Sequence, residues 1–197
     1  MTLEFRTETP ADVSAIETLT TAAFLHAPHT SHTEQFIVNA LRQASQLTLS
    51  LLAEKDGRLV GHVAISPVTV SSRAGDRKTS TGWYGLGPIS VTPDCQRQGI
   101  GAHLMAQVLV QLRQMGAAGC VLVGDPHFYN RFGFRPQPAL VLTDVPPEYF
   151  MALAFGDAVP AGVVSFHAAF GATDNVVLSR KPADWLGLLD EVAQNKG

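Results

Sequence analysis

Apolar residues recur along this chain with two periods, one typical of helices and one typical of strands. Ile100, Leu104, Val108 and Leu112 lie four residues apart, which predicts an amphipathic helix. Gly116 follows at a position where glycine commonly ends a helix. Further helices are expected at 11–24, 33–45 and 182–195, with one or two turns at 127–134.

Shorter runs that alternate or are wholly apolar predict strands, because turn residues bound them. The expected strands cover 3–9, 81–93, 119–126, 138–145 and 162–170, and a hairpin over 47–72 turns at Asp56-Gly57. The Pro- and Gly-containing segment 144–161 is expected to be a loop over a site. The order of strand, two helices, three strands, helix and strand predicts a mixed α/β fold, an α+β mixed sheet that is largely antiparallel in its first half.

Composition and charge exclude several classes of protein. The 197 residues carry a formal net charge of −3 and no Lys/Arg block, so we expect no nucleic-acid partner. No apolar run approaches the roughly 20 residues of a membrane helix, and the acidic start lacks the apolar core of a signal peptide. We therefore expect a cytoplasmic protein without membrane contact. His26, His29 and His32 lack a matching carboxylate set, so we expect no metal site.

Two glycines, Gly99 and Gly101, stand at the start of the helix predicted from residue 100. Free backbone N–H groups at such a turn form a site for an anion. A Walker loop would need Lys and Ser or Thr after the glycines, where this chain has Ala and His. A dinucleotide fingerprint would need a third glycine where the chain has Leu104. Residues 96–102, called the glycine turn below, are therefore predicted to hold an anion of another kind.

The strand predicted at 81–93 contains residues that central strands rarely tolerate. Its centre reads GLGP, and Pro88 lacks the N–H that a sheet needs. One interpretation is a simple turn. The other is a bulge where this strand leaves its neighbour and exposes unpaired backbone groups. In that case the amides of Ile89 and Val91 are available to an extended ligand that carries amides itself.

The run Gln96-Arg97-Gln98-Gly99-Ile100-Gly101 resembles the acetyl-CoA motif of the GNAT superfamily of N-acetyltransferases. The stretch FYNRFGF resembles the second signature of that family, with Tyr129, Gly133 and Phe134 at its fixed positions. Together with the late stretch GVVSFHAAF, it resembles the YhbS-like subgroup of bacterial acetyltransferases.

This resemblance implies the GNAT acyl-CoA N-acyltransferase fold, a mostly antiparallel central sheet with a splayed strand pair and flanking helices. It implies an N-acetyltransferase domain at 3–145 and a C-terminal extension at 146–197. The strand at about 162–170 is expected to join the same domain, and the terminal helix at about 182–195 to follow it.

The resemblance also implies acetyl-CoA as co-substrate, with direct transfer of the acetyl group to a primary amine in a ternary complex. Tyr129 is the implied general acid for the departing thiolate, although its ring also suits a packing role. The implied contacts of the pantetheine arm and the diphosphate are Ile89, Ser90, Val91, Gln96, Arg97, Gln98, Gly99, Ile100, Gly101 and Ala102.

Several points stay open at this stage. The general base is Glu34, His62 or water alone, because no Asp or Glu occurs in 81–92. The acceptor is a small-molecule amine or an amine of a peptide or protein. A non-catalytic acyl-CoA-binding or regulatory module, and an acyltransferase for longer acyl groups, are the alternatives on the same fold. The protein is expected to be a monomer or a homodimer.

Overall fold

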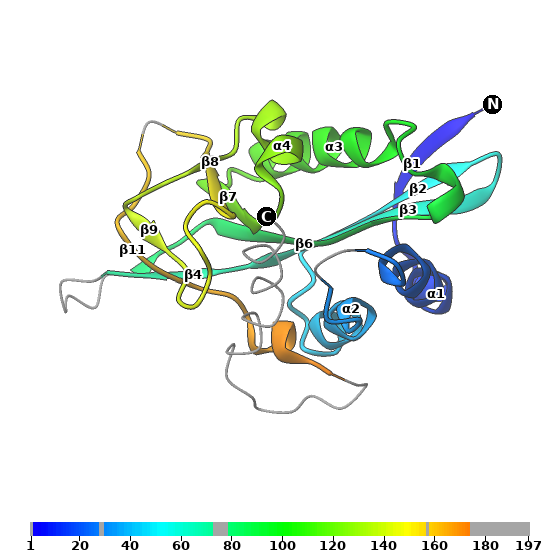
Figure 1. Cartoon of the computed structure of the whole chain (residues 1–197), viewed down its shortest axis with the longest axis horizontal. Coiled ribbons are helices and arrows are strands. Elements are labelled where there is room, and N and C mark those ends of the chain that lie inside the picture. The colour runs from blue at the N-terminus through cyan, green and yellow to red at the C-terminus, as the bar shows by residue number, and fades with distance from the viewer. Residues whose placement is uncertain (1, 28–29, 73–78, 157, 174–197) are drawn as a thin grey trace, which may run out of the picture.

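A computed structural model describes residues 2–27, 30–72, 79–156 and 158–173. Within these ranges, two sheets and the helices around them form a layered α/β structure (Figure 1). The helices α1 and α2 cover one face of the larger sheet, and α3 and α4 lie on the other face. The helix bounds are α1 Val13–Phe24, α2 Glu34–Gln43, α3 Ile100–Gln114 and α4 Pro126–Tyr129.

The larger sheet of the described residues has the strand order β1-β2-β3-β6-β7-β10-β8. Its neighbouring strands are antiparallel except for the pair β6 and β7. The expected mixed, mostly antiparallel fold is thus confirmed. Its strands are β1 Leu3–Thr7, β2 Leu49–Lys55, β3 Arg58–Pro67, β6 Trp83–Val91, β7 Gly119–Val123, β8 Arg135–Pro136 and β10 Phe150–Ala154.

The smaller sheet of the described residues has the order β5-β4-β11-β9. Strands β9 and β11 pair in parallel, and β4 pairs antiparallel with β11. Short 3-10 turns at 10–12, 93–95, 130–132 and 168–171 connect the larger elements. The strands are β4 Thr69–Ser71, β5 Thr79–Ser80, β9 Leu140–Val141 and β11 Gly162–Ser165.

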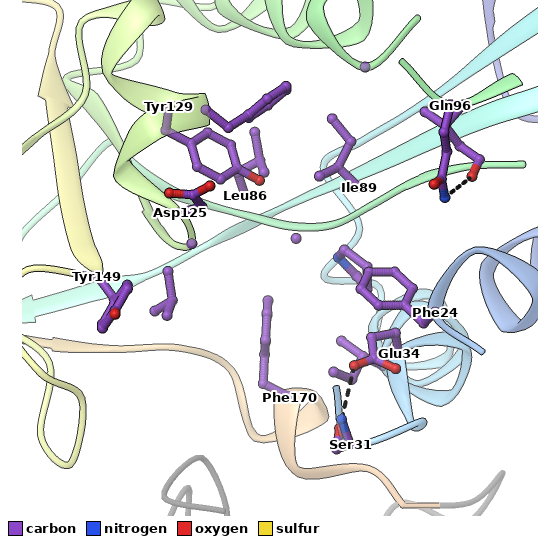
Figure 2. A pocket seen from close by; sticks show the side chains of 18 of the residues that line it. Phe24, Ser31, Glu34, Leu86, Ile89, Gln96, Asp125, Tyr129, Tyr149 and Phe170 are labelled. Carbon is purple, nitrogen blue, oxygen red and sulfur yellow. Dashed lines mark hydrogen bonds between the residues drawn. The ribbon is translucent and has the colours of Figure 1, made fainter. Parts of the chain in front are cut away.

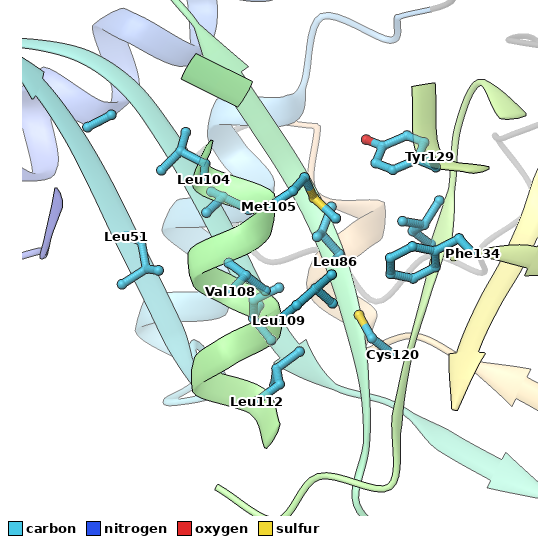
Figure 3. Packing of buried hydrophobic residues seen from close by; sticks show 14 of the residues in the cluster. Leu51, Leu86, Leu104, Met105, Val108, Leu109, Leu112, Cys120, Tyr129 and Phe134 are labelled. Atoms are coloured by element: carbon cyan, nitrogen blue, oxygen red, sulfur yellow. The ribbon is translucent and has the colours of Figure 1, made fainter. Parts of the chain in front are cut away.

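Helix α3 follows the predicted pattern closely. Gly99 precedes it with a φ of 85°, a left-handed conformation that favours glycine, and Gly116 follows it with a φ of 72°. The predicted apolar face is buried against β2, β3 and β6 (Figure 3). Figure 3 also shows Tyr129 and Phe134 close to the same core, so α3 and the α4 segment share one hydrophobic cluster.

Segment 144–161 contains a strand, so the prediction of a loop there is wrong. Phe150–Ala154 forms β10, which pairs with β7 on one side and β8 on the other. A strand buried on both faces has no polar alternation, and five apolar residues between Pro- and Gly-rich flanks do not distinguish such a strand from a loop.

The strands predicted at 138–145 and 162–170 are much shorter in the structure. Only Leu140–Val141 and Gly162–Ser165 are extended, and Ala168–Gly171 forms a 3-10 turn instead. The predicted helix at 182–195 lies outside the described residues. The division at residue 145 stays a prediction, and β10 and β11 lie beyond it in the two sheets. Among the described residues, no helix has the length and apolarity to cross a membrane.

Candidate active site

Strands β6 and β7 run together only briefly and then part. They pair in parallel over Trp83–Gly85, opposite Gly119–Val121. On its other edge, β6 stays paired with β3 as far as Val91. The β3–β6 register shifts at the position of Gly87 and Pro88, where two residues of β6 face one residue of β3. The predicted bulge is confirmed, and the simple turn is excluded.

The free edge of β6 presents backbone groups to the gap between the strands. Thr92 N donates to Val60 O of the neighbouring chain segment at 2.9 Å. Hydrogen-bonded pairs alternate along an antiparallel ladder. The backbone N–H and C=O groups of Ser90 therefore also point toward β3, whereas those of Ile89 and Val91 point into the gap. The amide of Gln96 donates to Val91 O at 3.1 Å, which leaves the N–H of Val91 directed into the gap.

The glycine turn exposes a set of backbone donors at the start of α3. The first helical hydrogen bond runs from His103 N to Gly99 O at 3.0 Å. In the part of the chain that the structure describes, the N–H groups of residues 97–102 have no acceptor. Arg97 and Gly99 have φ values of 60° and 85°, and these left-handed residues curve the N–H groups toward one point.

The β2–β3 hairpin holds this turn in place. Arg58 donates to the Asp94 carboxylate at 2.5 Å and contacts Cys95 Sγ at 3.2 Å. Lys55 Nζ donates to Gln98 Oε1 at 2.9 Å, and Gln98 in turn donates to Asp94 O. The two cations of the hairpin therefore tie the residues just before the turn, and Gln98 within it, to β2 and β3.

A cavity of about 1360 Å³ extends from the glycine turn through the gap between β6 and β7 to the far side of the sheet. Of the predicted site residues, it brings together Ile89, Val91, Gln96, Arg97, Gly99, Ile100, Gly101, Ala102 and Tyr129. Ser90 and Gln98 do not line it. The Ser90 side chain is buried near Thr20 of α1, and the Gln98 side chain bridges to the hairpin.

Tyr129 is held rigidly at the wall of the cavity. The Asp125 side chain caps α4 by accepting from His127 N at 2.8 Å. The ring lies so close over Gly124 that a Cβ there would come within 2.3 Å of it, and Phe128 packs edge-on at 4.9 Å. Burial raises the pKa of the Tyr129 phenol above its ordinary value, so the hydroxyl keeps its proton.

The opposite side of the cavity is called the α2 side below and consists of Phe24, Ser31, Thr33, Glu34, Ile37, Phe166 and 170–173. Figure 2 shows Glu34 and Phe170 across the cavity from Tyr129 and Asp125. Glu34 is only 9% exposed. Its Oε1 accepts from Thr30 Oγ1 at 2.6 Å, and within the described residues its buried Oε2 has no hydrogen-bond partner.

His62 lies elsewhere and does not face the cavity. It is fully buried, and its Nε2 is 2.9 Å from Ser50 Oγ. Glu8 and Arg42 complete this separate polar cluster on the α1–α2 face. Burial lowers the pKa of His62 to about 4, against the opposing charge of Glu8. Of the two side chains predicted as bases, only Glu34 lines the cavity.

Sequence reasoning missed several lining residues. Phe128 packs against the hydrophobic core and also lines the cavity, and the Arg131 guanidinium lies 4.5 Å from the centre of its ring. Phe166 and Phe170 reach the cavity from the second half of the segment predicted as a strand over 162–170, where the structure has a 3-10 turn at 168–171 instead. In the structure the Phe166 ring packs over Gly85, where a Cβ would lie 2.4 Å from it. Among the described residues, no His, Cys, Asp or Glu side chains gather to hold a metal ion.

Comparison with known sequences supports a family assignment. The profile of the acetyltransferase (GNAT) domain matches residues 4–137. The uncharacterized N-acetyltransferase YhbS of Escherichia coli (strain K12) is 35% identical over 131 residues. That match covers 66% of this chain and 72% of YhbS.

Solved structures agree with the sequence match. A GNAT family acetyltransferase from Brucella melitensis in complex with acetyl-CoA has a TM-score of 0.73 and 46% identity, covering 86% of this chain and 98% of that one. The E. coli YhbS structure in complex with CoA has a TM-score of 0.72 and 30% identity, covering 87% and 93%. The splayed strands, the glycine turn and these matches lead to one conclusion: the chain belongs to the GNAT family of acetyltransferases.

Proposed function

We propose that this protein transfers an acetyl group from acetyl-CoA directly to a primary amine within a ternary complex. One observation carries the proposal: a single cavity joins the free N–H groups of the glycine turn, the open edge of β6, Tyr129 and the Glu34 carboxylate. Two co-substrates therefore reach one point from opposite sides. The acetyl-CoA and CoA complexes of the Brucella and YhbS relatives support the choice of donor.

The residues present fit acetyl-CoA. The N–H groups of residues 97–102 suit the diphosphate, and the dipole of α3 adds roughly 0.5 elementary charge at the same end. The backbone of Ile89 and Val91 suits the amides of the pantetheine arm, because an extended ligand takes the place that β7 leaves. The Gln96 side-chain amide donates to Val91 O, so this hydrogen bond must break if the pantetheine arm binds to that carbonyl.

The chemistry then needs three groups. The amine nitrogen forms a bond to the thioester carbon, and the C–S bond breaks. The N–H of Ile89 stabilises the charge that develops on the carbonyl oxygen, a role typically worth about 3–4 kcal/mol in related chemistry. Tyr129 gives its phenolic proton to the leaving thiolate, and the second proton that the nitrogen loses as the amide forms restores the phenol.

The attacking amine must first lose a proton, and Glu34 is the candidate to receive it. The Glu34 side chain lines the cavity, and its buried Oε2 has no hydrogen-bond partner among the described residues. His62 cannot take this role from its position in the Ser50 cluster. The Glu34 carboxylate and the Tyr129 phenol lie across the cavity from each other (Figure 2), an arrangement that suits a base and an acid acting on opposite sides of a reacting carbon.

Two measurements test the proposal. Calorimetric titration with acetyl-CoA, with free CoA and NADH as comparisons, is expected to show micromolar binding of acetyl-CoA and none of NADH. Release of CoA thiol in the presence of an amine panel then separates an enzyme from a binding module. Binding of acetyl-CoA without turnover of any amine would show that the protein is a binding module rather than an enzyme. A clear preference for hexanoyl-CoA would show that the protein transfers a longer acyl group than acetyl.

A further inference from the structure

We infer that the α2 side of the cavity selects amines that carry one positive charge on an apolar body, with Glu34 as the counter-charge. This inference rests on the proposed function and adds the class of acceptor to it. Its starting point is the Glu34 carboxylate, which is 9% exposed and lines the cavity at the start of α2. A buried carboxylate oxygen without a donor is costly, so a ligand that supplies one binds there with advantage.

The Glu34 carboxylate is held in a fixed orientation by its own loop. Oε1 accepts from Thr30 Oγ1 at 2.6 Å and from Ser31 N at 3.3 Å. These bonds use one oxygen, and Oε2 is buried without a hydrogen-bond partner among the described residues, on a side chain that lines the cavity. An ammonium group offers three N–H donors and no acceptor, so it complements this oxygen in charge and in hydrogen bonding.

The surroundings of Glu34 are apolar and aromatic. Figure 2 shows its side chain between Phe24 and Phe170. Ile37 lines the same side one helical turn along, and Phe166 packs on Phe170 with ring centroids 4.7 Å apart. Such walls bind an apolar or aromatic body, and their ring faces also attract a cation.

The charges around the cavity exclude other amines. Among the described residues that line it, the Lys and Arg side chains are Arg97 and Arg131, and neither is on the α2 side. Arg131 stacks on Phe128 and donates to its carbonyl at 2.8 Å. The carboxylate of an amino acid therefore finds no cation beside Glu34. The carboxylates among these lining residues are Glu34 and Asp125, so a triamine such as spermidine would keep at least one positive charge without a partner.

Acetylation of 2-phenylethylamine, L-phenylalanine and spermidine tests the inference. The wild-type enzyme is expected to have a kcat/KM for 2-phenylethylamine at least about tenfold above that for the other two, because each carries an uncompensated charge. Glu34→Gln is expected to raise KM for 2-phenylethylamine by about 10- to 100-fold and to leave the Kd of acetyl-CoA unchanged. Glu17→Gln is the matched control, because Glu17 accepts from Asn39 on the same helix pair and lies off the cavity.

The results distinguish this inference from the proposed function. Equal or better use of spermidine or L-phenylalanine would overturn the acceptor class, and so would an unchanged KM in Glu34→Gln. Acetyl-CoA binding without acetylation of 2-phenylethylamine would also overturn it, while the proposed donor would stand. Loss of acetyl-CoA binding in the wild type would overturn the proposed function itself. The wild-type comparison decides the acceptor class even where the Glu34 variant folds poorly.

Discussion

The two sides of the cavity differ in the groups that line them, backbone N–H groups on one side and side chains on the other. The side at α3 presents backbone N–H groups from the consecutive residues 97–102 and from the edge of β6. The α2 side presents side chains from the end of α1, the start of α2 and the 3-10 turn at 168–171. A backbone site needs only a conformation that glycine permits, so a short local motif determines it. A side-chain site depends on residues that distant segments bring together, so chains that share a fold differ there more easily.

The largest expected effect separates the two sides directly. Gly99→Glu forces a side chain onto a left-handed residue and places a carboxylate among the free N–H groups. Losing two charge-assisted hydrogen bonds at about 1.5–3 kcal/mol each corresponds to a rise of at least roughly 100-fold in the Kd of acetyl-CoA. Calorimetric titration measures it.

Gly116→Glu provides the matched control for this change. Gly116 also has a positive φ of 72°, and a Cβ there meets nothing within 4 Å. It carries the same strain and charge at the opposite end of α3, so acetyl-CoA binding is expected to stay at the wild-type level. An equal loss in both variants would mean that strain in α3, rather than the anion site, determines the affinity.

The second effect concerns chemistry rather than binding. Tyr129→Phe removes the hydroxyl and keeps the ring that packs against Phe128 and Phe134. We expect kcat to fall by about 100-fold, the lower range for loss of a general acid, with the Kd of acetyl-CoA unchanged. Tyr84→Phe is the control, because Tyr84 packs on the same core and does not line the cavity. A wild-type kcat in Tyr129→Phe would assign Tyr129 a packing role only.

The same contrast explains which features the sequence predicted. The glycine turn and α3 are local, since their residues are adjacent and their conformations follow from glycine and from the apolar period. The bulge in β6 was also predictable, because Pro88 cannot take part in a regular ladder. By contrast, β10 carries no alternation, and its place beside β7 is a long-range pairing.

The α2 side shows why the rest of the site was not predictable. Glu34 was a candidate from its position at a helix start, but only the fold shows that His62 points away and that Glu34 keeps a free oxygen. Phe170 reaches the cavity by packing on α2 through Ile37 and Leu41, contacts without a local sequence pattern. Ser90 illustrates the opposite error, because adjacency to Ile89 and Val91 suggested a contact that strand alternation forbids.

A smaller effect tests whether the position of Tyr129 matters as well as its presence. Gly124→Ala would bring a Cβ within 2.3 Å of the Tyr129 ring, so the ring must move. We expect kcat to fall roughly tenfold, because misplacing a catalytic group by about 1 Å is costly. Gly156→Ala is the control, since a Cβ there meets nothing within 4 Å. Steady-state thiol release measures both, and equal rates would show that the hydroxyl tolerates displacement.

The smallest effect on activity is expected at His62, which lies outside both sides of the cavity. His62→Gln keeps a donor for Ser50 Oγ, so acetyl transfer near neutral pH is expected to stay within about twofold of wild type. A large loss of kcat with an altered pH–rate profile would restore His62 as the base and remove Glu34 from that role.

His62 is expected to affect the free energy of unfolding rather than activity. Burial holds its pKa at about 4, below the ordinary value of 6.5, so the unfolded chain binds more protons between these values. The contribution of His62 is therefore complete above about pH 6.5 and is lost as the pH falls toward 4, on the order of 3 kcal/mol in total. Denaturant unfolding at pH 7.5 and at pH 5 measures the difference. His62→Gln is expected to reduce the pH dependence in that window, and an unchanged slope would show that other groups, such as Glu8 beside Arg42, cause it.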